Sequence, residues 1–287
     1  MKKVAYFRST YLTFGKDEVL DMSQNTVNYI AHNYYGRANI LGIGIGAVSM
    51  DRAIVLAEGL LRSGGKGYIC VTGVHGIMEA QKDAELKQVL NDSYLTTPDG
   101  MPTVWIGRYQ GYEMERVYGP DFMIEFCTRA MARGYRHFLY GGKPGVAEHL
   151  KHNLENIIPG IQIAGWYTPP FRPLSPEEEL QLRHAVREAN ADVLWVGLST
   201  PKQEHFMADY LNELDVQLMV GVGAAFDIHT GAIKDAPLWI KNSGLQWLHR
   251  LVQDYRRLWK RYLINNPLFV WKVVLQIIGL KSYSIDK

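Results

Sequence analysis

The stretch "ADVLWVGLSTPKQEHFMADYLNELDVQLMVGVG", residues 191–223, decides the fold class. It predicts an apolar strand over 191–198, a helix over 201–214 that has proline in its first turn, and a second apolar strand over 216–223. Nearly continuous apolar strands are typical of a sheet that helices cover on both faces. Because a single helix joins the two strands, the stretch predicts a parallel β–α–β unit.

The same alternation runs through the chain on the N-terminal side of this unit. Further strands are predicted over 66–73, 91–96, 135–142 and 161–167, and helices over 49–64, 78–92, 122–134, 145–160 and 175–190. Residues 38–48 read as a strand or a hairpin, and their glycines are spaced GxGxG rather than GxGxxG, which disfavours a nicotinamide-dependent dehydrogenase. We expect an α/β fold: a Rossmann-like, largely parallel sheet with helices on both faces.

Composition divides the 287 residues into three regions. Residues 1–36 are a polar N-terminal arm of uncertain structure, residues 37–233 are the α/β domain, and residues 234–287 are a helical appendage. The appendage carries ten Lys/Arg and three Asp/Glu, a balance of +7, whereas the remainder carries 21 and 26, a balance of −5. The basic tail therefore predicts an anionic partner. The sequence holds no CxxC-type metal motif, no signal peptide and no uncharged apolar run of about 20 residues.

The segment "TPDGMP", residues 97–102, places an acid between a proline and a glycine just after a predicted strand. Pro98 favours an extended entry and Gly100 permits a tight turn, so a stiff backbone holds Asp99 at a strand end. Ligands of parallel α/β sheets collect at these carboxyl ends. A carboxylate there can serve as a general base. The alternative is a turn or capping residue for a helix over 101–108.

A glycine pair marks another strand end, in "FLYGGKPGVAE". Gly141, Gly142 and Lys143 lie between a predicted strand and the N-terminus of a helix. Glycine allows close backbone approach, and the unpaired N–H groups of a helix N-terminus favour an anion such as a diphosphate. The alternative is a tight strand-to-helix turn that needs glycine conformations.

Polar residues follow two more of the predicted strands. In "PKQE", Lys202 and Gln203 can bind phosphate and sugar hydroxyls, or they belong to a solvated first helical turn in which the helix dipole favours Glu204. In "VTGVHG", Thr72 ends a strand and His75 follows it. Both are candidates for polar contacts with a ligand, and the alternative for His75 is an ordinary loop residue.

The tail contains an amphipathic helix, predicted over 247–263. Tryptophan, tyrosine and leucine lie on one half of the helix, and five basic residues lie on the other: Arg250, Arg256, Arg257, Lys260 and Arg261. This pattern is typical of an element that lies on an anionic membrane surface. The apolar run after Pro267 is too short to span a bilayer. The alternative is a helical pair that packs on the body or in the seam of a homo-oligomer.

These motifs, in this order, resemble the WecG/TagA/CpsF family of bacterial glycosyltransferases, glycosyltransferase family 26. The resemblance extends roughly from Ile40 to Pro267. It rests on six segments, "PDGMPTVW", "RVYGPD", "FLYGGKPGVAE", "VGLSTPKQE", "GVGAAFDIHTGAIKDAPLWI" and "GLQWLHRLVQDYRRLWKRYL". Six motifs in register make a specific match, and the segments outside it are poorly covered.

The resemblance implies an inverting transfer of a sugar from a UDP-sugar to a polyprenyl-diphosphate-linked sugar. This reaction belongs to the synthesis of wall polymer, capsule or exopolysaccharide. It implies an enzyme without metal or other cofactor that is bound peripherally to the cytoplasmic face of the membrane, with residues 37–233 as its catalytic domain. Nucleic acid is not an expected partner. The alternative from another class is a non-catalytic nucleotide-sugar-binding scaffold of a polysaccharide assembly complex.

The resemblance also assigns roles to residues of this chain. It implies that Asp99 is the general base, that Gln203 and Thr72 belong to the catalytic site, that Arg116 binds diphosphate and that Asp227 lies near the nucleotide. Arg116, the glycine loop and the basic residues of the tail would supply the positive charge and N–H dipoles that a departing diphosphate needs.

The chain departs from the family pattern at two places. The family commonly has asparagine two positions after the threonine, and here Val74 and then His75 follow, so we expect His75 to cover part of that role in sugar or acceptor preference. Gln246 stands where glutamate is common.

Overall fold

The computed structural model describes residues 35–285, so most of the predicted N-terminal arm, residues 1–36, lies outside the described residues. Its central element is a six-stranded sheet with the strand order β4-β3-β8-β7-β5-β6. The strands are β3 (Gly67–Thr72), β4 (Leu95–Pro98), β5 (Arg136–Gly141), β6 (Gln162–Tyr167), β7 (Val193–Gly197) and β8 (Leu218–Gly221). Every neighbouring pair is parallel, which confirms the predicted sheet.

The glycine-rich segment near the N-terminal end of the described residues forms a hairpin. Strands β1 (Arg37–Ile40) and β2 (Ile43–Gly46) pair antiparallel around Leu41 and Gly42, which both have positive φ. A Cβ on Gly46 would lie 2.7 Å from the side chain of Leu95, so glycine lets the hairpin pack closely on β4. This confirms the hairpin interpretation of the GxGxG spacing.

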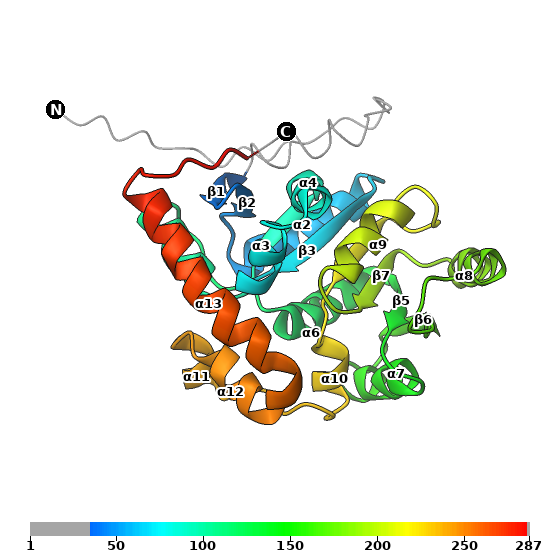
Figure 1. The fold of residues 1–287 in the computed structure, drawn as a ribbon. Helices are drawn as coiled ribbons and strands as arrows, with labels where there is room; N and C mark the ends of the chain where they lie inside the picture. The colour runs from blue at the N-terminus through cyan, green and yellow to red at the C-terminus, as the bar shows by residue number, and fades with distance from the viewer. Residues whose placement is uncertain (1–34, 286–287) are drawn as a thin grey trace.

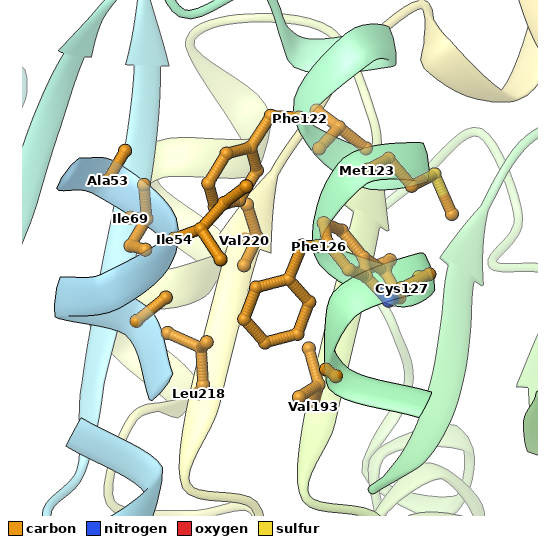
Figure 2. Close-up of a cluster of buried hydrophobic side chains, with 14 of the residues drawn as sticks. Ala53, Ile54, Ile69, Phe122, Met123, Phe126, Cys127, Val193, Leu218 and Val220 are labelled. Carbon is orange, nitrogen blue, oxygen red and sulfur yellow. The ribbon is translucent and has the colours of Figure 1, made fainter. Parts of the chain in front are cut away.

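One face of the sheet is covered by α2 (Met50–Arg62), α6 (Gly119–Ala130), α7 (Val146–Ile157) and α10 (Ala225–His229). Phe122 and Phe126 of α6 insert between this helix, α2 and the strands, as Figure 2 shows. Ser49 caps α2 through its side chain, which accepts from the Arg52 N–H, as the sequence predicts. Burial of such aromatic side chains is the main stabilising term of this layer.

The opposite face is covered by α4 (Ala84–Asp92), α8 (Pro176–Ala189) and α9 (Lys202–Tyr210), and α3 (Val74–Glu79) and α5 (Met101–Tyr109) begin just beyond two strand ends. The single helix predicted over 78–92 is wrong. The chain forms α3 and α4 instead, because the Asp83 side chain accepts from the Leu86 N–H and starts a new helix.

The tail is helical, as predicted, and consists of α11 (Leu238–Asn242), α12 (Gln246–Gln253) and α13 (Tyr255–Ile277). The continuous helix predicted over 247–263 is wrong, because the backbone leaves the helical conformation at Asp254. Helix α13 then continues through Pro267. No helix within residues 35–285 is long and apolar enough to cross a membrane.

Helix α13 lies along one side of the body and passes α3 toward the β1–β2 hairpin (Figure 1). Phe269 and Val273 are buried in the same cluster as the hairpin residues. The Gln276 side chain accepts from the Leu41 N–H at 3.0 Å and donates to the Asn39 carbonyl at 2.9 Å. The C-terminal appendage and the α/β domain therefore share one apolar core.

Candidate active site

A cleft of about 820 Å³ lies at the carboxyl ends of β4, β3, β8 and β7. The four strands are neighbours in the sheet, so the residues that follow them meet at one edge. The tail forms the opposite wall, with Gln246 and Trp247 at the start of α12 and Asn266 on α13. The cleft is therefore built from both the sheet and the tail.

Asp99 lies in this cleft directly after β4. The parallel register pairs Pro98 with Thr72, and the Asp99 N–H donates to the Thr72 carbonyl at 3.2 Å. The Gly119 N–H approaches the Asp99 Oδ1 at 3.4 Å. Gly100 is the N-cap of α5, and no side chain caps that helix, so the capping alternative for Asp99 does not apply. Burial raises the pKa of the Asp99 carboxyl, and nearby arginines partly oppose this effect.

Arg116 is held in the cleft by contacts from three parts of the chain. Its Nε donates to the Asp99 carbonyl at 2.7 Å, and its Nη2 donates to the Gln246 Oε1. Its guanidinium lies 4.2 Å from the centre of the Tyr118 ring. Gln246 is neutral, so it orients the guanidinium without cancelling its charge. The remaining N–H groups of Arg116 suit an anionic ligand.

Gln203 also lines the cleft, from the first turn of α9. Its Oε1 accepts from the Gly223 N–H at 3.0 Å, and its Nε2 donates to the Glu204 Oε1 at 3.0 Å. The Thr200 hydroxyl donates to the same Glu204 oxygen at 2.9 Å. Glu204 is only 1% exposed, so the interpretation of this turn as solvated is wrong for Gln203 and Glu204, whereas Lys202 is exposed.

Thr72 and His75 lie on the same side of the cleft. The Thr72 hydroxyl is buried and has no hydrogen-bond partner within residues 35–285. Burial and the nearby Arg261 lower the pKa of His75 to about 4, so its imidazole is neutral near pH 7. The sequence departure at His75 therefore places an uncharged ring, not a cation, in the cleft.

Three of the five predicted basic residues of the tail line the cleft: Arg250, Arg257 and Arg261. Arg256 and Lys260 are exposed and do not line it. The predicted single polar arc is divided within α13, where Arg257 and Arg261 line the cleft and Arg256 and Lys260 do not, and Arg250 lines the cleft from α12. Burial lowers the pKa of Arg261, and Arg250 and Arg257 add to this effect. The cleft therefore concentrates positive charge beside Asp99.

The glycine loop does not reach this cleft. Gly141, Gly142 and Lys143 follow β5, which lies beyond β7 in the sheet, and none of them lines the cleft. A Cβ on Gly141 would lie 2.6 Å from the Gly197 carbonyl oxygen, which matches the alternative of a tight turn that requires glycine. Lys202 does not line the cleft either, whereas Asp227 does.

The family model of the glycosyl transferase WecG/TagA/CpsF family matches residues 38–283. The chain belongs to this family. The match reaches further into the tail than the six sequence motifs do, which agrees with the packing of α13 on the body. WecG/TagA/CpsF membership makes the chain a glycosyltransferase and confirms the family resemblance.

A relative in Bacillus subtilis (strain 168) is 31% identical over 205 residues, which are 71% of this chain and 77% of the relative. Its name is N-acetylglucosaminyldiphosphoundecaprenol N-acetyl-beta-D-mannosaminyltransferase. The name describes that protein as a transferase that acts on a polyprenyl-diphosphate-linked sugar.

Two features of this WecG/TagA/CpsF cleft were not assigned a role from the sequence. Glu204 was not expected to be buried. Lys241 was not singled out; its Nζ pairs with Asp235 and lies 3.2 Å from the Asp121 Oδ1, so it joins α11 to α6. The Tyr118 hydroxyl donates to Asp235 at 3.0 Å. The local sequence does not signal the Lys241–Asp121 and Tyr118–Asp235 contacts, because in each the two partners are more than 100 residues apart in the chain.

Proposed function

We propose that this glycosyltransferase moves a sugar, with inversion, from a UDP-sugar to a polyprenyl-diphosphate-linked sugar in the synthesis of a cell-surface polymer. The observation that carries the proposal is a half-buried carboxylate, Asp99, in a cleft lined by four arginines from the body and the tail. The name of the relative supports an acceptor of the N-acetylglucosaminyl-diphospho-polyprenol class and an N-acetylhexosamine as the transferred sugar.

The proposed reaction needs one base. Asp99 takes the proton of the acceptor hydroxyl while the oxygen attacks the anomeric carbon of the donor. The bond between that carbon and the diphosphate breaks as the new glycosidic bond forms, so the configuration inverts. The raised pKa makes Asp99 a stronger base than an exposed aspartate, and the charge of Arg116 acts against this rise and favours the ionised form.

The leaving diphosphate gains negative charge as the bond breaks. Arg116 offers N–H groups on the side of the sheet, and Arg250, Arg257 and Arg261 offer them on the side of the tail. Within residues 35–285 no three His, Cys, Asp or Glu side chains are grouped to hold a metal ion. We therefore propose that arginine stabilises the leaving group, with no metal or other cofactor.

The acceptor carries a long lipid, so the cleft has to open at a membrane surface. Large apolar side chains are exposed on the helices of the tail: Leu238, Trp239, Leu248, Val252, Val270 and Trp271. The exposed Arg256 and Lys260 add charge that anionic lipids attract. We propose that this surface binds peripherally to the cytoplasmic face of the membrane.

The decisive experiment mixes purified protein, a panel of UDP-sugars and a polyprenyl-diphosphate-N-acetylglucosamine acceptor, and measures UDP release and lipid product. We expect product with a UDP-N-acetylhexosamine. Asp99→Asn should bind UDP with near-normal affinity and lose about 10²–10⁴-fold in turnover, because it cannot accept the proton.

Asp215→Asn is the matched control, because Asp215 is exposed and does not line the cleft. It should turn over like the wild type. Binding of UDP-sugar without turnover by the wild type would instead support the scaffold function. Full turnover by Asp99→Asn would remove Asp99 from the mechanism.

A further inference from the structure

We propose that Glu204 is a positioning residue that fixes the orientation of the Gln203 side-chain amide in the cleft. The inference rests on the proposed function, and it takes Gln203, which lines the cleft, as a side chain that contacts the substrates. It starts from a buried carboxylate that the proposed reaction does not use. Glu204 is 1% exposed and Gln203 is 2% exposed, and they are adjacent in the first turn of α9.

The partners of the Gln203 amide allow only one orientation. The Gly223 N–H can only donate, so it requires the amide oxygen, and their separation is 3.0 Å. The Glu204 Oε1 receives the Thr200 hydroxyl and the Gln203 Nε2, so it acts as the acceptor for both. A flipped amide would set a donor against the Gly223 N–H and an acceptor against the Glu204 oxygen.

The fixed orientation defines what Gln203 can offer a substrate. One N–H of its Nε2 group is used by Glu204, and one N–H remains. Glycine at position 221 of β8 leaves room for this amide. Any other residue would place its Cβ 3.1 Å from the Gln203 Nε2. Gln203 is thereby held as a hydrogen-bond donor to an oxygen of the sugar or the diphosphate.

A purely stabilising role does not explain Glu204. Its Oε2 is buried without a hydrogen-bond partner within residues 35–285. A buried carboxylate in such a setting lowers the stability of the fold, so stabilisation does not account for its presence. The two donors that converge on its Oε1 are the feature that a positioning role requires.

The conservative variant separates positioning from acid–base catalysis. In Glu204→Gln, the side-chain oxygen can still accept from Thr200 and from Gln203, so the amide orientation is kept. Glu204→Leu removes the acceptor. We expect Glu204→Gln to stay within about threefold of wild-type kcat, and Glu204→Leu to lose about 10²-fold, as for the removal of one transition-state donor. Equal losses in the two variants would overturn the proposal and make the charge of Glu204 essential.

A double-mutant cycle gives the second test. If Glu204 acts through Gln203, the variant Gln203→Leu should lose about as much as Glu204→Leu, and the double variant should lose no more than Gln203→Leu alone. Losses that multiply would show an independent role for Glu204 and overturn the proposal. If Glu204→Leu does not fold, Glu204→Asp takes its place, because it keeps the charge and withdraws the acceptor by one methylene.

A third readout does not depend on turnover. In protein labelled with ¹⁵N-glutamine, the Gln203 side-chain amide signal is assigned by its loss in Gln203→Leu. It should keep its chemical shift in Glu204→Gln and move in Glu204→Leu; an unchanged signal in Glu204→Leu would overturn the proposal. If the wild type turns over no UDP-sugar, the proposed function fails, and this measurement still decides whether Glu204 orients the amide.

Discussion

At the carboxyl end of β4, Asp99 is subject to two opposing effects. Burial raises its pKa, and the charges of Arg116, Arg250 and Arg261 lower it. A base in this position has to be ionised to accept a proton and has to keep a high affinity for that proton. Burial serves the second need, and the nearby cations serve the first.

We expect kcat/KM to have an acid limb above pH 3.8, the ordinary pKa of aspartate. Activity should be lost as the pH falls through the raised pKa, because the protonated carboxyl cannot act as a base. Arg116→Gln removes a cation that lowers this pKa, so the limb should move to higher pH. Rates normalised to the plateau of each variant, measured from pH 4 to 9, test this. A limb at the same pH in both proteins would contradict the assignment.

Charge stabilisation by arginine predicts resistance to chelators. We expect the rate of UDP release to stay unchanged in EDTA, because the cleft draws its positive charge from side chains. The control is a metal-dependent glycosyltransferase in the same buffer, which should stop. Loss of activity in EDTA with recovery on addition of Mg²⁺ or Mn²⁺ would contradict the proposal for the leaving group.

At the scale of single elements, β5 and β7 are joined by a buried polar contact inside an aromatic cluster. The Trp195 Nε1 donates to the His137 Nδ1 at 3.2 Å, and Phe126 packs edge-on against both rings. An accepting Nδ1 has to be unprotonated. Burial lowers the pKa of His137 to about 4, so the strand pair requires a neutral histidine.

This contact predicts a pH-dependent free energy of unfolding. The unfolded chain binds a proton at His137 below pH 6.5, and the folded chain resists it down to about pH 4, so stability falls as the pH falls through this window. For His137, the shift of the pKa from 6.5 to about 4 corresponds to about 3 kcal/mol in the free energy of unfolding. His75, with a pKa of about 4, acts in the same direction.

Chemical denaturation at several pH values from 7 to 4 measures the effect. His137→Phe should be less stable at pH 7, because the Trp195 N–H loses its acceptor, but it should lose less stability than the wild type between pH 6.5 and 4. His184→Gln, at an exposed site, should keep the full dependence. An unchanged pH dependence in His137→Phe would contradict the assignment.

At the scale of the whole molecule, the tail forms part of the lining of the candidate active-site cleft. Gln246 contacts Arg116 across the cleft, Lys241 joins α11 to α6, and Phe269 is buried with the β1–β2 hairpin. The tail also exposes apolar and basic side chains on its outer surface. One segment therefore has two surfaces, which we propose serve catalysis and membrane binding.

Two charge-matched double variants separate these roles. Arg250→Gln with Arg261→Gln changes the cleft, and Arg256→Gln with Lys260→Gln changes the outer surface. Both remove two positive charges. The outer pair should weaken binding to anionic vesicles by about 2 kcal/mol, at about 1 kcal/mol for each residue, and should leave turnover of a short water-soluble acceptor unchanged.

The cleft pair should lower turnover of that soluble acceptor about 10²-fold. Sedimentation with vesicles and UDP release give the two readouts. Normal turnover in the cleft pair would show that its arginines do not act on the diphosphates. Normal vesicle binding in the outer pair would contradict the membrane role of that surface.

The sequence by itself determined the features that short-range patterns encode. Apolar runs separated by helical segments predicted the parallel sheet, the glycine spacing at 42–46 predicted the hairpin, and the stiff turn around Asp99 predicted a carboxylate at a strand end. Each of these depends on the conformational preferences of a few adjacent residues, so no distant partner is needed to recognise it. The family resemblance added Arg116 and Asp227, which the structure places in the cleft.

Only the tertiary structure decided which strand ends are neighbours. Gly141 and Lys143 have the local pattern of a phosphate loop, but the order of the strands puts β5 outside the cleft. Glu204 has the local pattern of an exposed first turn, but packing buries it against Gln203. The basic residues of the tail appear as one arc in the sequence, but the packing of α13 places Arg257 and Arg261 in the cleft and leaves Arg256 and Lys260 outside it. Strand order, burial and helix packing of this kind depend on contacts between residues far apart in the chain, which the spacing of residues along the sequence does not encode.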